Sequence, residues 1–196
     1  MKDRLLLFGS PTVEYSGESV ALPFERRTQL LALLALKRSW IGRAELATML
    51  WPDLETERAY RNLRKILHRV QLLPWARNLE VRSGGVRFEA ETDVSAFESA
   101  LREQRIADAL PMRRGELLAG FEDDQSEAWS SWLNFERDRL RLAWRDAALA
   151  RPAARGGLLD GEADGGLLRE LVADLRPRGL GDAGAPHLQQ HGGGGG

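Results

Sequence analysis

Cysteine is absent from all 196 residues of the chain. The protein therefore has no disulfide framework, and no thiol is available as a nucleophile or as a metal ligand. A chain without disulfides is compatible with a reducing compartment. We expect this protein to be cytoplasmic.

Long hydrophobic runs are also missing. Leu5 to Phe8 is too short an apolar run to form the central region of a secretory signal peptide. The longest other run, Leu30 to Leu36, falls far below the roughly 20 residues that a transmembrane helix needs. The sequence thus predicts a soluble intracellular protein without a membrane partner.

Motifs of catalysis and metal binding are lacking as well. No Gly-Lys-Ser/Thr phosphate loop occurs, and the acidic run 122–124 lacks the spacing of a calcium loop. His68 is the only histidine outside the C-terminal segment, so no Ser/His/Asp arrangement can be assembled. His187 and His191 have a metal-like spacing, but two ligands in a glycine-rich segment do not form a site. We expect no enzymatic activity, no cofactor and no bound metal.

Charge is present in ordinary amount, at 29% of the residues, but it is unevenly distributed. Residues 1–92 contain 15 Lys and Arg against 11 Asp and Glu, whereas residues 93–150 contain 8 against 12. A basic block beside an acidic one suggests a polyanionic partner for the first block only.

The first 50 residues alternate between strand and helix signals. Leu5–Phe8, Thr12–Tyr15 and Val20–Leu22 are predicted strands separated by glycine and proline. Thr28–Lys37 is apolar on nearly every side, which predicts a buried helix. A second helix should begin after Gly42 and end near Trp51, because Pro52 cannot continue it.

The segment from Glu55 to Leu72 predicts an amphipathic helix. One face carries apolar residues at helical spacing: Ala59, Leu63, Ile66, Leu67 and Val70. The opposite face carries basic or titratable residues: Arg58, Arg61, Arg64, Lys65 and His68. Two short strands follow, 79–82 and 86–89, joined by a glycine turn that predicts a hairpin. The order of strands, three helices and a hairpin is that of a winged helix-turn-helix.

The basic face suggests insertion into the major groove of DNA, where arginine contacts guanine and phosphate. Arg43, at the start of the second helix, could place a cation near a phosphate. Two plainer interpretations remain open: a solvated helix face, and an ordinary surface charge at Arg43.

Helices are predicted again after residue 92. Ser95 with Glu98 has the pattern of a capping box, and Phe97, Leu101 and Ile106 predict a short amphipathic helix. Residues 126–150 predict a long helix whose tryptophans, at 129, 132 and 144, pack in a core. Residues 151–196 are rich in glycine, and we expect this tail to be disordered or loosely attached.

Short motifs along residues 4–150 give the chain a family resemblance. They are Leu7-Phe8-Gly9 with Pro11, Leu22-Pro23, Leu33-Leu34-Ala35-Leu36, Arg43-Ala44-Glu45-Leu46-Ala47, Leu50-Trp51-Pro52-Asp53, Asn62-Leu63-Arg64, Asp93-Val94 with Phe97, Arg114-Gly115-Glu116-Leu117-Leu118, Gly120-Phe121, and Trp132-Leu133 with Glu136-Arg137. In this combination the chain resembles bacterial transcriptional activators of the antibiotic regulatory protein (SARP) type. These proteins join an OmpR-type winged helix to a helical bacterial transcriptional activator domain (BTAD).

The resemblance implies an α+β fold with an N-terminal sheet and a winged helix in residues 1–92. Residues 93–150 would be the start of a truncated, all-α, tetratricopeptide-like activator domain. It further implies that Arg82 and Arg87, on either side of the wing turn, meet the minor groove or the DNA backbone; plain hairpin solubility is the alternative. The implied partners are promoter DNA, read as direct repeats by a homodimer, and RNA polymerase.

Three alternatives stay open at this stage. The helical second segment could make the protein an interaction module for another protein. The chain could also be a remnant with no activating function. The tail from 151 to 196 could come from a shifted reading frame or from a degenerate truncation.

Overall fold

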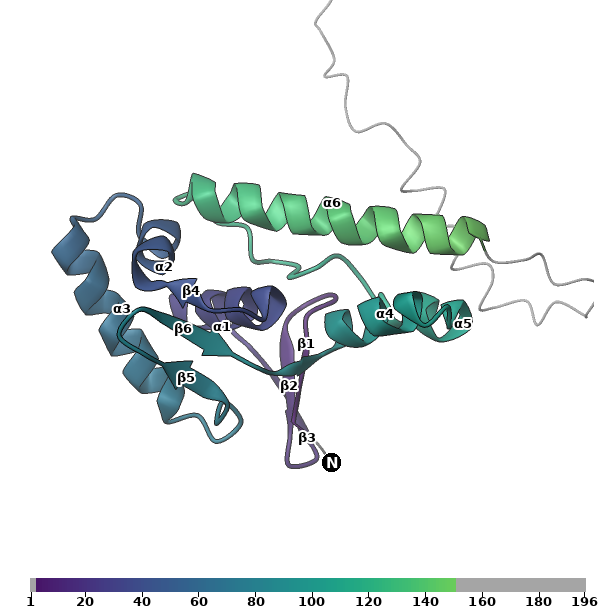
Figure 1. The fold of residues 1–196 in the computed structure, drawn as a ribbon, viewed down its shortest axis with the longest axis horizontal. Coiled ribbons are helices and arrows are strands. Elements are labelled where there is room, and N and C mark those ends of the chain that lie inside the picture. Colours follow the sequence, from purple (N-terminus) through teal and green to yellow (C-terminus); the bar gives the residue numbers. More distant parts are fainter. Residues whose placement is uncertain (1–2, 151–196) are drawn as a thin grey trace, which may run out of the picture. The chain divides into compact units, whose positions relative to one another are not determined.

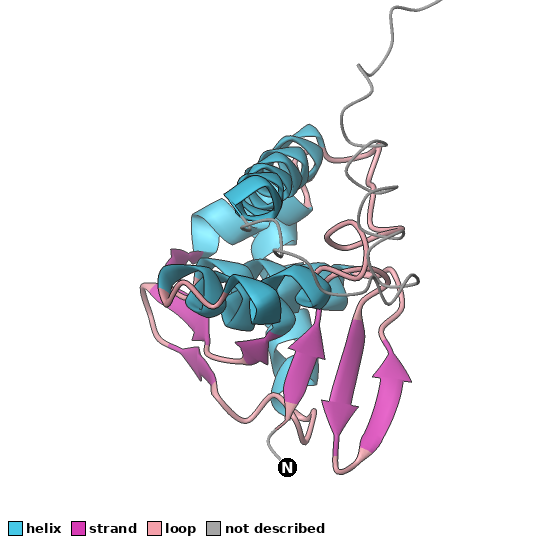
Figure 2. Cartoon of the chain, turned by 90° about the vertical axis from the view of Figure 1, so that its right-hand side faces the viewer, coloured by secondary structure: helices cyan, strands magenta, loops and turns pink. Residues whose placement is uncertain are grey.

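The computed structural model of the chain describes residues 3–150, in which small sheets pack against a set of helices (Figures 1 and 2). The predicted α+β fold with an N-terminal sheet is confirmed for this part. The predictions for the tail from 151 to 196 lie outside the described residues. Among the residues that are described, no helix is long and apolar enough to cross a membrane.

The N-terminal sheet is a three-stranded meander closed by a distant fourth strand. Its strands are β1 (Arg4–Leu6), β2 (Thr12–Tyr15), β3 (Glu18–Ala21) and β7 (Glu91–Thr92), in the order β3-β2-β1-β7. Ser16 and Gly17 turn β2 into β3, and both have positive φ angles of 52° and 88°. The sequence did not predict β7, which pairs parallel to β1.

Three helices and a second small sheet follow. They are α1 (Arg26–Lys37), β4 (Ile41–Gly42), α2 (Arg43–Leu50), α3 (Thr56–Gln71), β5 (Leu79–Val81) and β6 (Gly85–Phe88). Residues 28–35 of α1 are all buried, as the continuous apolar run predicted. β4 was not predicted; it adds to the hairpin to give the order β4-β6-β5. The element order is that of a winged helix, and we call residues 79–88 the wing.

The remaining elements are helical. They are α4 (Asp93–Arg102), α5 (Ile106–Ala109), the short 3-10 helix η1 (Leu110–Met112) and α6 (Glu127–Ala150). Two predictions from the sequence for the region after residue 92 are wrong. Thr92, rather than Ser95, caps α4, because its hydroxyl accepts from the Ser95 N–H at 2.8 Å while the Ser95 hydroxyl accepts from the Thr92 N–H at 3.1 Å. The helix predicted to run through Ile106 ends at Arg102, since Gln104 takes a left-handed φ of 57° and Ile106 begins α5.

The carboxylate of Asp93 joins α4 to the first strand region. It accepts hydrogen bonds from the backbone N–H groups of Leu7 at 2.7 Å, Phe8 at 3.0 Å and Val94 at 2.9 Å. Burial raises the pKa of Asp93, although these three bonds oppose the rise. The rings of Phe8 and Phe97 pack edge to face beside it, 5.6 Å apart. Residues 3–150 therefore lie in one compact unit, and the predicted domain boundary at 92 stays a prediction.

α6 is held by its tryptophans and by polar contacts at its first turn. Trp129 and Trp144 are fully buried, and their indole N–H groups donate to the carbonyls of Phe121 at 2.8 Å and Leu110 at 3.2 Å. The hydroxyl of Ser126 donates to the Met49 carbonyl of α2 at 2.7 Å. The expectation that the tryptophans of this helix are core residues is confirmed.

Replacing Asp93 by Asn tests the junction. The amide can accept on one side only, so its NH₂ group faces the N–H of Leu7 or Phe8 and leaves that donor unpaired. We expect Asp93→Asn to lower the free energy of unfolding by about 1–3 kcal/mol in urea denaturation. Asp124→Asn is the matched control, because Asp124 is exposed and has no partner among the described residues. Equal stability of the two variants would contradict a structural role for Asp93.

Candidate nucleic-acid interface

α3 is buried along one side. Ala59, Leu63, Leu67 and Val70 are each at most 5% exposed and pack toward α1 and α2. Ile66, which was predicted on the same face, is only half-buried. The four buried positions repeat every three or four residues, so a single stripe of the helix meets the core.

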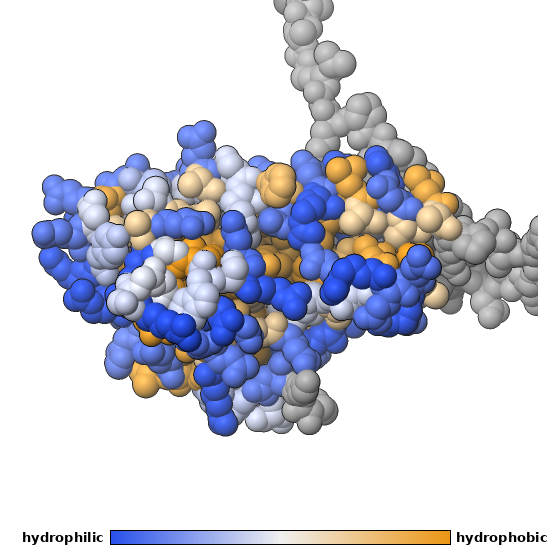
Figure 3. Space-filling view, in the orientation of Figure 1, coloured by the Kyte–Doolittle hydropathy of each residue, from blue (hydrophilic) through white to orange (hydrophobic). Residues whose placement is uncertain are grey.

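The other side of α3 presents basic side chains to solvent. We define the basic face as five residues, all exposed: Arg58, Arg61, Arg64, Lys65 and His68. None of them forms a hydrogen bond or an ion pair with another residue in the range 3–150. Hydrophilic side chains project over α3 at the left edge of Figure 3. The structure therefore gathers the predicted residues of this helix on one free surface.

Arg69 is an exposed cation that the sequence analysis missed. It lies four residues after Lys65, and residues four apart are neighbours on a helix surface. Helical spacing alone was therefore a sufficient signal to include it with the basic face.

A groove of about 250 Å³ lies between α3, the start of α2 and strand β5 of the wing. It is lined by residues of α2, α3 and β5: Arg43, Tyr60, Leu63, Arg64, Leu67, His68, Gln71 and Val81. Figure 1 shows α3 at the left of the molecule beside the hairpin of β5 and β6. The groove brings Arg43 together with two residues of the basic face.

Arg43 is half-buried and bonded to the wing. Its Nη2 donates to the Arg82 carbonyl at 2.9 Å, while its Nε is buried without a partner in the part of the chain described. Arg43 therefore links the start of α2 to the wing turn, and its contact with a phosphate stays a prediction.

The two wing arginines are paired within the protein. Arg82 and Arg87 both bind the carboxylate of Glu80, and both guanidinium groups lie over the ring of Trp40, at 4.4 Å and 5.3 Å from its centroid. The hydrogen bond from Arg87 lowers the pKa of Glu80, and the same bond raises the pKa of Arg87. The side chain of Arg82 is 67% exposed, whereas that of Arg87 is 29% exposed.

Glu80 and Trp40 were not among the predicted site residues. Glu80 lies directly opposite Arg87 in the β5–β6 pair, so the hairpin register contained a signal for that contact. Trp40 lies outside the hairpin, before β4, and no local pattern relates it to the wing.

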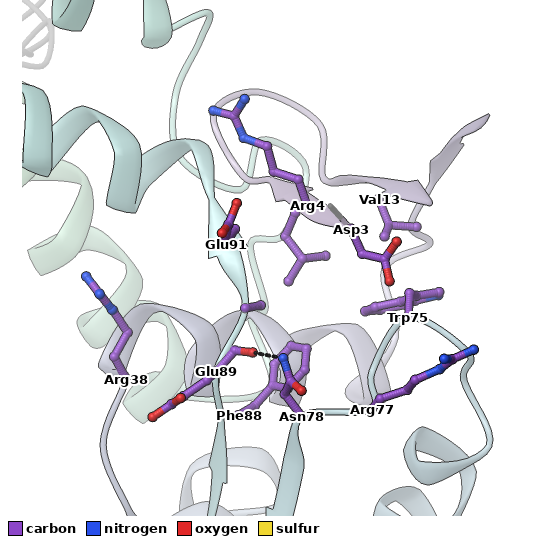
Figure 4. Close-up of a pocket in the computed structure, with 12 residues that line it drawn as sticks. Asp3, Arg4, Val13, Arg38, Trp75, Arg77, Asn78, Phe88, Glu89 and Glu91 are labelled. Carbon is purple, nitrogen blue, oxygen red and sulfur yellow. Dashed lines mark hydrogen bonds between the residues drawn. The ribbon is translucent and has the colours of Figure 1, made fainter. Parts of the chain in front are cut away.

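A larger cavity of about 700 Å³ lies where residues 75–78 and 88–91 meet the N-terminal sheet. Its lining combines charged side chains with aromatic ones: Asp3, Arg4, Leu5, Val13, Arg38, Trp75, Arg77, Asn78, Phe88, Glu89, Ala90 and Glu91. In Figure 4 the side chains of Arg4, Arg38 and Arg77 point in different directions, and Asn78 donates to the Glu89 carbonyl at 3.2 Å. The charged groups drawn there do not converge on one point. Within residues 3–150, no group of three or more His, Cys, Asp or Glu is placed to hold a metal ion.

The fold is similar to that of a known regulator. No protein-family model and no curated protein sequence matches the chain. Among solved structures, it is similar to Mycobacterium tuberculosis EmbR in complex with a low-affinity phosphopeptide, with a TM-score of 0.53 and 16% sequence identity. The match covers 76% of this chain and 46% of the EmbR chain, so this protein spans less than half the length of that structure. EmbR has a SARP/OmpR-type winged helix and a BTAD, and the predicted resemblance is therefore confirmed at the level of the fold.

Close approach of β4 and β6 fixes the wing and allows a test. A Cβ atom on Gly85 would lie 2.8 Å from the Ile41 carbonyl oxygen, whereas one on Gly84 would meet nothing within 4 Å. We expect Gly85→Ala to force the two strands apart and to lower the free energy of unfolding by about 1–3 kcal/mol. Gly84→Ala is the control and should be close to neutral. Urea denaturation of both variants measures the difference, and a stable Gly85→Ala protein would show that β4 does not hold the wing.

Proposed function

We propose that the protein is a sequence-specific, DNA-binding transcriptional regulator. It inserts α3 into the major groove and places the wing beside it on the DNA. Residues 3–92 carry this binding activity. No catalytic step is part of the proposal.

The free basic face of α3 carries this proposal. Its five side chains are exposed and lack partners among the described residues, while the opposite stripe is buried. A major groove about 12 Å wide admits one α-helix, and arginine pairs with guanine or with phosphate oxygens there. The arginines and the lysine of this face have no ion pair within the described residues to break before they meet a polyanion, which favours DNA over a neutral partner.

The fold similarity to EmbR supports the regulator class and extends the proposal to other partners. From the family resemblance of the sequence we propose that residues 93–150 begin a tetratricopeptide-like activator domain that contacts RNA polymerase. A homodimer on direct repeats of promoter DNA belongs to the same proposal. In the family, further helices follow this start of the activator domain, and gene activation would also need them. We therefore expect residues 3–150 to bind promoter DNA but to activate transcription poorly.

One observation favours the alternative of a protein-interaction module. Phe135, Leu142 and Leu149 follow one another at intervals of seven residues on α6, and they are 65%, 42% and 67% exposed. Apolar side chains in such a row are typical of surfaces that contact proteins. The DNA-binding experiment below separates the two functions.

The experiment starts from duplexes that the purified chain selects from random fragments. Arg61, Arg64 and Lys65 are replaced by Ala, singly and together. We expect each base-reading arginine to contribute about 1–3 kcal/mol at the selected duplex. Loss of a phosphate contact should instead weaken selected and scrambled duplexes alike and lower the salt dependence by about one unit.

Arg102→Ala is the matched control for charge. Arg102 is an exposed cation on α4, and its side chain contacts only Ser99 among the interactions found in the described part. This variant should bind like the parent protein. Unchanged DNA affinity in the triple variant, with circular dichroism showing an intact fold, would exclude α3 from the DNA.

A further inference from the structure

Three side chains of the wing form a cluster with Trp40, which lies before β4: they are Glu80, Arg82 and Arg87. Glu80 accepts from Arg82 Nη2 at 3.2 Å through one oxygen, and through the other it binds Arg87 at Nε and Nη2. Trp40 lies under both guanidinium groups. A single negative charge is therefore shared between the two arginines of the wing.

The two arginines are held unequally. Arg87 is half-buried and binds two carboxylates, those of Glu80 and of Glu89, the latter at 3.0 Å. Arg82 has a single contact with one oxygen of Glu80 and is 67% exposed. Exposed ion pairs with one contact contribute little to stability, because water competes for both partners. Arg82 can therefore exchange its partner, whereas Arg87 stays in place.

Hydrogen bonds fix the main chain at Arg82, even though its side chain can exchange Glu80 for another partner. The Arg82 N–H donates to the Gly85 carbonyl at 2.9 Å across the turn, and the Arg82 carbonyl accepts from Arg43 at 2.9 Å. The guanidinium of Arg82 lies over the flat ring of Trp40, which attracts a planar cation. Exchange of the partner thus requires rotation of one side chain and no movement of the wing.

We infer that Glu80 is an internal counter-ion that competes with DNA for Arg82. In the free protein Glu80 occupies Arg82; in the complex a backbone phosphate takes its place, since a guanidinium binds phosphate through two parallel hydrogen bonds. Trp40 keeps the guanidinium at the wing surface in both states, and Arg87 remains with Glu80 and Glu89. Glu80 therefore sets the DNA affinity of the wing without touching DNA. This inference rests on the proposed function.

Glu80→Gln is the direct test. We expect the variant to bind selected and scrambled duplexes about two- to fivefold more tightly, because the competing carboxylate is gone. Glu89→Gln removes the same charge from the end of the hairpin, where the carboxylate pairs with Arg87 and with no other residue of the described range. It should leave DNA affinity nearly unchanged. An equal gain in both variants would show a general effect of net charge and would overturn the role of Glu80.

A double variant that combines Glu80→Gln with Arg82→Ala tests whether Glu80 acts on DNA affinity through Arg82. If Glu80 acts through Arg82, the substitution Glu80→Gln gives no gain in a protein that already carries Arg82→Ala. Arg82→Ala alone should weaken both duplexes alike and lower the salt dependence by about one unit. This single variant tests the phosphate contact even if Glu80→Gln impairs folding. If Arg82→Ala instead weakens binding to the selected duplex alone, Arg82 reads a base. This result would overturn the exchange with phosphate.

The outcome also separates this inference from the proposed function. A parent protein that selects and binds no duplex contradicts the proposed function itself. A parent that binds through α3, with Glu80→Gln and Glu89→Gln indistinguishable from it, leaves the function intact and contradicts the role of Glu80 alone.

Discussion

A single stripe of buried side chains fixes α3 against α1 and α2, and the rest of the interface depends on it. Leu63 and Val70 are at most 1% exposed, and Ala59 and Leu67 complete the stripe. Side chains have fixed positions around the axis of a helix. Burial of this stripe therefore determines which residues of α3 face solvent. It turns the basic face toward solvent and sets the groove between α3 and the wing. The side of α3 that is buried, more than the number of its cations, therefore defines the candidate DNA surface.

The wing differs from α3 in how its charge is held. The basic face has no internal partners within residues 3–150, whereas both wing arginines are bound to Glu80 and lie over Trp40. Two kinds of contribution to DNA binding follow from this difference. α3 offers its cations without a prior interaction to break, and the wing offers Arg82 only in exchange for an existing ion pair.

The sequence predicted the features that have a local period or a local turn signal. The buried α1, the two faces of α3 and the glycine-turn hairpin belong to this group. The two-residue strands β4 and β7 were missed, because pairing with distant strands creates them and their own residues show no pattern. The cap of α4 was misplaced by three residues although its signal is local, since the hydroxyls of Thr92 and Ser95 accept from each other's backbone N–H groups. By contrast, nothing local indicated that Arg43 binds the wing or that Trp40 contacts Arg82.

The claim that α3 and the wing form the DNA surface is tested most directly by a nuclear magnetic resonance titration. The ¹⁵N-labelled chain is titrated with its selected duplex, and the shifts of the backbone amide signals are followed. If α3 and the wing form the DNA surface, the largest changes occur in residues 58–69 and at the wing turn around Arg82, and the signals of α4 and α6 stay nearly unaffected. Large changes along α6 with unchanged signals from α3 would contradict this surface and would place the duplex on α6.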